Sequence, residues 1–324
     1  MTMRVLVKGA GVAGLAVARE LVARGADITV AEPEPGFAAA ASWYAGGMLA
    51  PWCERESTDE TVLTRGRGAA DWWDRALPGE VRRNGTLVVA LPRDAGELKR
   101  FASRTSGYQW LDADGIGALE PALAGRFRQA LFFPGEAHLD PRRALSLLSE
   151  KLAARGVAFV RDEDEGRFDL VVDCTGASKI GSLEGLRGVR GEMLYLETDE
   201  LELSRPVRLL HPRIPLYIVP RGDGLFMCGA TMIERDDAGP ITARSLMEFL
   251  NAAYALHPGF GEARLIETGT GVRPAFPDNL PRVLRAGKTI IVNGLYRHGF
   301  LLSPALASEA AGLVLGEQDR REIF

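Results

Sequence analysis

The hydrophobic pattern at the start of the chain predicts a strand, a helix and a second strand joined by short turns. Residues 4–8 and 28–32 are mostly apolar runs, and between them apolar positions recur at helical spacing from about Val12 to Arg24. Gly25 follows directly, as is typical of the residue after a helix C-terminus. Strands joined through one helix by such short links favour a parallel sheet covered by helices.

The elements further along the chain mix this pattern with a second one. Asp140 before Pro141 predicts the start of a helix, and the run 169–174, with its apolar centre at 170–172, is typical of a buried parallel strand. From 191 to about 232 the pattern instead favours antiparallel strands, with a hairpin turn at 221–224. Other expected elements are strands at 86–91, 157–160, 193–196, 216–220, 225–232 and 289–292, helices at about 141–155, 243–256 and 303–315, irregular helix from about 95 to 124, and a loop or broken helix at 42–51.

These patterns together predict a mixed α/β fold. A Rossmann-like domain is expected to carry an inserted, discontinuous second domain built on an antiparallel sheet. The expected division assigns 1–75, 136–186 and 268–324 to the first domain, and 76–135 and 187–267 to the second. A length of 324 residues suits roughly two domains of about 150 residues each.

Composition and charge narrow the classes of partner. The formal net charge of -4 leaves no cationic excess for nucleic acid or an anionic membrane surface, so neither is expected as a partner. Arg4 and Lys8 interrupt the N-terminal apolar stretch, which argues against a signal peptide or a membrane span there. The three cysteines, Cys53, Cys174 and Cys228, lack CxxC spacing and suit reduced, buried thiols in the cytoplasm.

A glycine-rich turn with dinucleotide-binding spacing lies between the first strand and the first helix. Gly9, Gly11 and Gly14 fit G-x-G-x-x-G, where the first glycine permits the turn, the second lets amides approach a pyrophosphate, and the third allows close helix packing. Glu32 ends the second strand, where a carboxylate can accept hydrogen bonds from both ribose hydroxyls. The motif fits NAD and FAD equally, because both carry ADP.

The segment after the second strand favours a flavin over a nicotinamide. Ala45, Gly46, Gly47 and Met48 form a stretch whose side chains are small enough for backbone amides to touch a flat ring. A nicotinamide-only enzyme would not need such a stretch at this point in its chain. A flexible surface loop is the alternative interpretation of this segment.

Motifs along nearly the whole chain resemble the D-amino-acid oxidase family of FAD-dependent oxidoreductases, most closely its glycine oxidase (ThiO) branch. They are GAGVAG at 9–14 with Glu32, ASWYAGGMLAP at 41–51, DCTGA at 173–177, YIVPR at 217–221, GATM at 229–232, GVRP at 271–274 and GLYRHGF at 294–300. Each motif alone is modest support, but their order and spacing make the resemblance specific.

The resemblance implies a role for each matched position. Arg273, whose backbone Pro274 restricts to extended conformations, is expected to clamp the substrate carboxylate together with Tyr217. Met48 and Met232 are expected to line the substrate pocket. Read without the resemblance, an arginine of this kind more often forms a surface ion pair, and a tyrosine or methionine more often fills a core. The residues expected to bind FAD are Gly9, Gly11, Val12, Ala13, Gly14, Glu32, Ser42, Ala45, Gly46, Gly47, Met48, Thr175, Gly176, Arg273, Arg297, His298, Gly299, Phe300, Leu301 and Leu302.

The C-terminal loop and helix complete the expected site. Residues 297–302 are expected to run past the pyrimidine edge of the flavin. The helix starting near Pro304 is expected to point its positive end toward N1 and the C2 carbonyl, where reduced flavin carries negative charge. His298 is assigned a loop role rather than that of a general base. With four histidines and no metal-ligand spacing, the sequence predicts no metal.

The activity that the resemblance implies is oxidative deamination. An FAD-dependent enzyme would oxidise glycine or another small amino acid to the imine, and O2 would be reduced to H2O2. The imine would hydrolyse to the 2-oxo acid or pass to a thiazole synthase, a partner in thiamine biosynthesis. Alternatives that stay open are a sarcosine oxidase, a D-amino-acid oxidase or dehydrogenase, an NAD-dependent dehydrogenase and a non-catalytic dinucleotide binder, and a homo-oligomer is one possible state.

Two departures from the family pattern concern substrate and cofactor contacts. The link between Val160 and Asp169 is shorter than usual in the family, which affects contacts on the adenine side. Pro215 stands where some relatives carry histidine, so the substrate range is expected to extend to sarcosine or another small amine.

Overall fold

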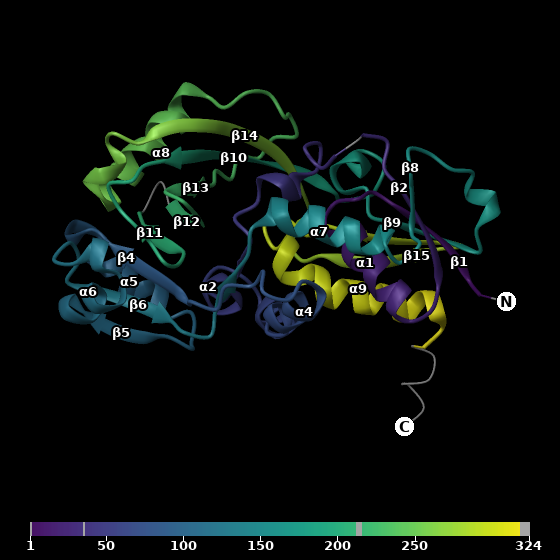
Figure 1. The fold of residues 1–324 in the computed structure, drawn as a ribbon, viewed down its shortest axis with the longest axis horizontal. Helices are drawn as coiled ribbons and strands as arrows, with labels where there is room; N and C mark the ends of the chain where they lie inside the picture. The colour runs from purple at the N-terminus through teal and green to yellow at the C-terminus, as the bar shows by residue number, and fades with distance from the viewer. Residues whose placement is uncertain (1, 35, 212–215, 318–324) are drawn as a thin grey trace.

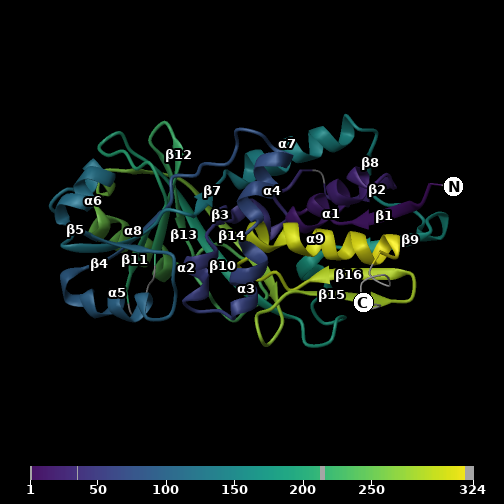
Figure 2. The same ribbon diagram turned by 90° about the horizontal axis from the view of Figure 1, so that it is seen from below.

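Two sheets organise the chain, and the segments that build them alternate along the sequence (Figure 1). The computed structural model describes residues 2–34, 36–211 and 216–317. Each sheet forms the centre of one lobe, and the view at right angles separates the same two lobes (Figure 2). The mixed α/β architecture predicted from the sequence is therefore confirmed.

The first sheet has the order β15-β16-β9-β1-β2-β8 and is parallel apart from its antiparallel edge strand β15. Its central strand is apolar and covered on both faces, so Val5, Leu6 and Val7 are fully buried. Its strands are β1 (Arg4–Lys8), β2 (Asp27–Ala31), β8 (Ala158–Val160), β9 (Leu170–Asp173), β15 (Arg282–Ala286) and β16 (Thr289–Asn293).

Helices α1, α3 and α4 of the same lobe pack against α9, and Figure 1 shows α9 running beside α1 and α4. The helices of this lobe are α1 (Val12–Ala23), α2 (Pro51–Arg55), α3 (Glu60–Gly66), α4 (Ala69–Ala76), α7 (Pro141–Ala153) and α9 (Gly299–Leu315). The predicted start of α7 is confirmed, because the side chain of Asp140 accepts hydrogen bonds from the backbone N–H groups of Arg142 and Arg143. Helix α1 also begins at Val12, as expected.

The second sheet has the order β14-β10-β13-β12-β11-β4-β6-β5 and is antiparallel except where β11 pairs with β4. The long strands β10 and β14 arch from this sheet toward the first lobe (Figure 1). The elements of this lobe are β4 (Thr86–Ala90), β5 (Gln109–Asp112), β6 (Gln129–Phe133), β10 (Arg187–Glu197), β11 (Val207–Leu210), β12 (Leu216–Gly222), β13 (Leu225–Gly229), β14 (Arg264–Ala275), α5 (Ala95–Ala102), α6 (Ala113–Leu119) and α8 (Ala243–Leu256).

Several short elements complete the fold. A two-stranded pair, β3 (Met48–Leu49) with β7 (Ala137–His138), joins the segment before α2 to the segment before α7. Single 3-10 turns occur at η1 (Ala41–Tyr44), η2 (Pro92–Asp94), η3 (Pro121–Leu123), η4 (Glu165–Arg167), η5 (Gly176–Lys179) and η6 (Pro258–Phe260). The segment 42–51 is thus a broken helical stretch followed by a short strand, and the short link before Asp169 is an exposed turn that contains η4.

Several strands were missed or given different bounds from the sequence, because their residues do not alternate between apolar and polar. Strand β14 carries glycines and polar residues, and it is held by pairing with β10 along its length rather than by an apolar face of its own. Strand β10 likewise extends well beyond the predicted 193–196, because it pairs with β14 along its whole length. The region predicted as irregular helix at 95–124 also contains β5, and the strand predicted at 225–232 ends at Gly229.

The last helix begins earlier than predicted. It starts at Gly299 and contains Pro304 inside the helix, where a proline removes one backbone donor. The carbonyl of Phe300, which would have accepted that donor, instead accepts the indole N–H of Trp73 at 2.8 Å. A contact from a distant helix therefore makes the helical proline tolerable, and the local sequence does not reveal it.

The proposed division into domains remains a prediction. Its boundary at 267/268 falls inside β14, all of which lies in the second sheet. None of the described helices is long and apolar enough to cross a membrane.

Candidate functional site

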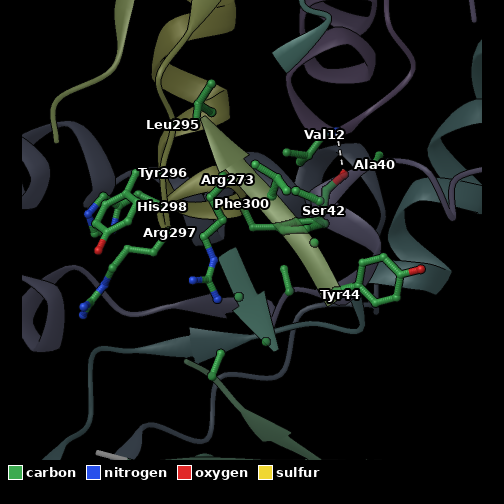
Figure 3. A pocket seen from close by; sticks show the side chains of 18 of the residues that line it. Val12, Ala40, Ser42, Tyr44, Arg273, Leu295, Tyr296, Arg297, His298 and Phe300 are labelled. Atoms are coloured by element: carbon green, nitrogen blue, oxygen red, sulfur yellow. Dashed lines mark hydrogen bonds between the residues drawn. The ribbon is translucent and has the colours of Figure 1, made fainter. Parts of the chain in front are cut away.

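A cavity of about 1110 Å³ is lined by residues of both lobes. It extends from the turn between β1 and α1 to the face of the second sheet that carries Tyr217. In Figure 3, Arg273 lies between the Val12–Ser42 contact on one side and Tyr296 and Arg297 on the other. The predicted residues that line it are Gly9, Gly11, Val12, Ala13, Glu32, Ser42, Ala45, Gly46, Gly47, Met48, Thr175, Gly176, Tyr217, Met232, Arg273, Arg297, His298, Gly299, Phe300 and Leu301.

Two predicted residues do not line this cavity. Gly14 lies beneath the turn, where a Cβ would meet the Gly9 carbonyl oxygen at 1.8 Å, so its glycine serves the close packing expected of the third motif position. Leu302 is fully buried in the core of the first lobe. Pro215 lies outside the described residues.

The turn between β1 and α1 has the geometry of an anion site. Gly9 adopts φ +93, and a Cβ there would lie 2.7 Å from the Cys174 carbonyl oxygen, so only glycine fits. The amide of Ala10 donates to Glu32 Oε2 at 2.7 Å, and the amide of Val12 donates to Ser42 Oγ at 3.3 Å (Figure 3). Amides at a helix N-terminus beside a strand-end carboxylate match the pyrophosphate and ribose of a dinucleotide, so these residues fit the ADP half of FAD.

The small residues of the 45–48 loop are required by close contacts. Gly47 has φ +72, and a Cβ there would lie 2.2 Å from the Leu139 carbonyl oxygen. At Gly46 a Cβ would meet the Tyr217 ring at 2.8 Å. Arg221, which the sequence reasoning did not single out, holds this loop by donating to the Gly46 carbonyl at 2.9 Å. The loop is therefore a fixed wall of the cavity and not a mobile surface segment.

The Arg273 side chain projects from β14 and is held by its contacts with Thr231 and Gly191. Its Nη1 donates to the Thr231 carbonyl at 2.8 Å, and Gly191 provides the space for its guanidinium, since a Cβ there would lie 2.2 Å from Nη2. Burial lowers the pKa of Arg273, whereas Tyr217 raises it, and a guanidinium stays protonated at neutral pH. Among the residues that the structure describes, no carboxylate forms an ion pair with Arg273, so its charge is available to an anionic ligand.

Tyr217 stands next to Arg208 and Gly229 in the sheet, and its ring is wedged between Gly46 and Gly229. Burial raises the pKa of its hydroxyl, although Arg273 acts in the opposite direction. The hydroxyl is therefore protonated at neutral pH and can donate a hydrogen bond. Arg273 and Tyr217 together present a cation and a donor to the same cavity.

A buried ionic cluster next to this pair was missed from the sequence. Glu54, which is only 7% exposed, accepts from Arg208 Nη2 at 2.6 Å and from Arg297 Nε at 2.7 Å, and its Oε2 lies 3.3 Å from His298 Nδ1. Burial raises the pKa of the Glu54 carboxyl, but Arg297 and Arg208 outweigh it and hold this pKa well below its usual value. The available signal was Arg208, a charge inside an otherwise apolar strand.

The loop before α9 brings the remaining predicted residues together. His298 is 1% exposed and occupies the position before the helix, and burial lowers its pKa, so it is neutral at pH 7. Because α9 begins at Gly299 and not near Pro304, its positive N-terminal end lies at the cavity wall itself. No group of three or more metal-ligating side chains occurs within the described part of the chain.

Comparisons with known proteins agree with this geometry. The family model for FAD dependent oxidoreductases, DAO, matches residues 4–313. A Rhizobium etli protein named as a candidate thiamine biosynthesis oxidoreductase ThiO is 65% identical, with 99% of each chain covered. A glycine oxidase of Pseudomonas aeruginosa is 28% identical, covering 98% of this chain and 96% of its own.

Two further relatives bear on architecture. A bifunctional protein ThiO/ThiG of Synechocystis is 26% identical and matches 98% of this chain but only 52% of its own length. The solved structure of glycine oxidase from Bacillus cereus superposes with a TM-score of 0.82 at 21% identity, covering 98% and 96% of the two chains. That likeness establishes the fold.

Proposed function

The chain belongs to the DAO family of FAD-dependent oxidoreductases, and on this basis we propose that it oxidises glycine or a similarly small amino acid with O2 as the electron acceptor. FAD is the cofactor, and amino acids are the class of substrate.

One observation supports this proposal most strongly. Arg273 lies in the same cavity as the dinucleotide-type turn, has no carboxylate partner among the described residues, and shares that cavity with Tyr217, whose hydroxyl is within its electrostatic influence. A guanidinium and a phenol can hold a carboxylate at two points. Gly46 and Gly229 lie against the Tyr217 ring and Gly191 lies against the Arg273 guanidinium, with no space for a Cβ, so both side chains are held in place.

The residues of this chain bind and orient the substrate. FAD, when bound, supplies a two-electron acceptor for the C–H bond next to the amine. Arg273 and Tyr217 fix the carboxylate, so that the α-carbon is presented in one orientation. Glu54 is poorly suited to take a proton, since two arginines keep it ionised, and His298 has a lowered pKa. The reaction in this proposal therefore depends on positioning, with the substrate amine entering in its neutral form.

The fate of the product is proposed from the relatives. The Rhizobium etli relative is named for thiamine biosynthesis, and in Synechocystis the matching segment is part of a ThiO/ThiG protein. We infer that the imine serves a thiazole-forming enzyme in the same pathway. Hydrolysis of the imine to glyoxylate would compete with this transfer.

The test is anaerobic mixing of the yellow protein with glycine, sarcosine and D-alanine while the flavin absorbance is followed, and then admission of air. The proposal expects bleaching fastest with glycine, followed by O2 consumption and H2O2 release. Fastest bleaching with sarcosine or D-alanine would reassign the substrate. Bleaching without peroxide would indicate a dehydrogenase, and flavin that no amine bleaches would indicate a binding module.

A further inference from the structure

Met232 places an exposed methionine side chain in the wall of the cavity that contains Arg273. Its side chain is 47% exposed, whereas Met193 and Met227 are 1% and 0% exposed. Met247 is more exposed, at 60%, but it lies on α8 and does not line the cavity. Met232 therefore combines access to solvent with a position at the proposed reaction site.

Two hydrogen-bond donors converge on this sulfur from the loop before α9. The hydroxyl of Tyr296 and Nη1 of Arg297 each lie 3.4 Å from Met232 Sδ. Figure 3 shows both donor side chains next to one another on the same side of Arg273. Arg297 is fixed by Glu54, which accepts from its Nε and pairs with its Nη2, so Nη1 is left facing the sulfur. A thioether is a weak acceptor, and two donors aimed at it are better matched to an oxygen.

We propose that Met232 is a modification site, at which H2O2 formed in the cavity oxidises the thioether to methionine sulfoxide. This inference rests on the proposed oxidase function, which supplies the oxidant. The sulfur lone pair attacks one peroxide oxygen and the O–O bond breaks. Sulfur loses two electrons and keeps that oxygen, and the other oxygen leaves as water with both hydrogens. Tyr296 and Arg297 are placed to hydrogen-bond the peroxide as this happens.

The modification changes the cavity wall. A sulfoxide is polar and its oxygen is a strong acceptor, so it takes up the hydrogen bonds of Tyr296 and Arg297 and ties the side chain to them. A flexible apolar wall thereby becomes a fixed polar one beside the substrate. We expect the KM for the amine to rise as turnovers accumulate, which makes the enzyme limit its own activity. Methionine sulfoxide reductases are expected to reverse this change.

The test measures sulfoxide formation during turnover of the FAD-loaded enzyme, with catalase present to destroy peroxide that reaches bulk solvent. Tryptic peptide 222–235 contains both Met232 and the buried Met227, which serves as an internal control. Peptide 245–264 contains Met247, an accessible methionine outside the cavity. We expect sulfoxide at Met232 to exceed that at Met247 several-fold, whereas peroxide added to resting enzyme oxidises Met247 at least as fast.

Matched variants connect the modification with activity. Each variant's rate is compared with its own initial rate. In Met232→Leu, the decline of this relative rate with the number of turnovers is expected to disappear. Met247→Leu is expected to decline as the unchanged enzyme does. Oxygen consumption with equal oxidation of both methionines would overturn this inference and leave the oxidase function standing. If amine oxidation consumes no oxygen, the oxidase function fails, and the inference fails with it.

Discussion

Arg297 donates from Nε to Glu54 Oε2 at 2.7 Å, and its Nη2 lies 2.7 Å from the same oxygen, although the two residues are 243 positions apart. The pair connects α2, which contains Glu54, with the loop before α9, and Arg208 adds a third side chain from the second sheet. Three segments that line one cavity are thus fixed to one another by a single carboxylate.

Removing the Glu54 carboxylate is expected to lower the free energy of unfolding. Glu54→Gln removes the carboxylate that pairs with the buried Arg208 and the half-buried Arg297, and the loss of one partner of a buried pair destabilises a protein by about 3–5 kcal/mol. Urea unfolding of the holoprotein measures this change in the free energy of unfolding. Glu60→Gln, which breaks an exposed pair with Arg55, is the control and is expected to cost about 1 kcal/mol or less. Equal effects of the two substitutions would show that the Glu54 cluster is not stabilising.

The bond from Trp73 to the Phe300 carbonyl is expected to matter only because residue 304 is proline. Trp73→Phe leaves a buried carbonyl without a donor, at a cost of about 1–3 kcal/mol in addition to any change in packing. In a Pro304→Ala background the helix regains its own donor at this position. The cost of Trp73→Phe is therefore expected to be smaller there. A double-mutant cycle measured by unfolding tests this, and strict additivity would contradict the explanation.

His138 is expected to make stability depend on pH. Burial, together with Arg221, Arg82 and Arg205, lowers its pKa from 6.5 to about 3. Below pH 6.5 the unfolded chain binds a proton that the folded chain refuses, so stability falls as pH falls, by about 1.4 kcal/mol per pH unit from this residue. Unfolding of His138→Gln should show a shallower slope, with a difference that grows from about half this amount at pH 6.5 to nearly the full amount at about pH 5. Parallel slopes would mean that His138 titrates normally in the fold.

We expect substrate binding to depend on the space that Gly191 leaves for the Arg273 guanidinium. A Cβ at Gly191 would lie 2.2 Å from Nη2, so Gly191→Ala should displace the guanidinium and raise KM while FAD remains bound. Gly96→Ala is the control, since no atom lies within 4 Å of its Cβ position in α5. It should leave KM unchanged and keep or slightly increase stability. An unchanged KM in Gly191→Ala would place the substrate carboxylate elsewhere.

The first sheet and the dinucleotide turn were predictable because their signals are local. Buried parallel strands are continuous apolar runs, and the motif at Gly9 stands between a strand and a helix that the pattern itself predicts. Asp140 before Pro141 is likewise a local signal for a helix start. Each of these depends on residues that are close together in the sequence.

What could not be predicted depends on distant contacts. Strand β14 is held by β10, and α9 extends past Pro304 because of Trp73. Glu54 becomes part of the cavity only through arginines that lie 154 and 243 positions away. The roles proposed for Arg273 and Tyr217 came from family resemblance, since no local pattern distinguishes them from a surface arginine and a core tyrosine.

The most direct test of the account is the rate of anaerobic flavin reduction as a function of glycine concentration in Arg273→Ala. If Arg273 anchors the carboxylate, the variant keeps its flavin, and the slope of the reduction rate against low glycine concentrations falls by at least about 30-fold, which corresponds to roughly 2 kcal/mol of lost binding. Arg285→Ala, which removes an exposed arginine of β15, should match the unchanged enzyme. A glycine dependence in Arg273→Ala equal to that of the unchanged enzyme would contradict the account.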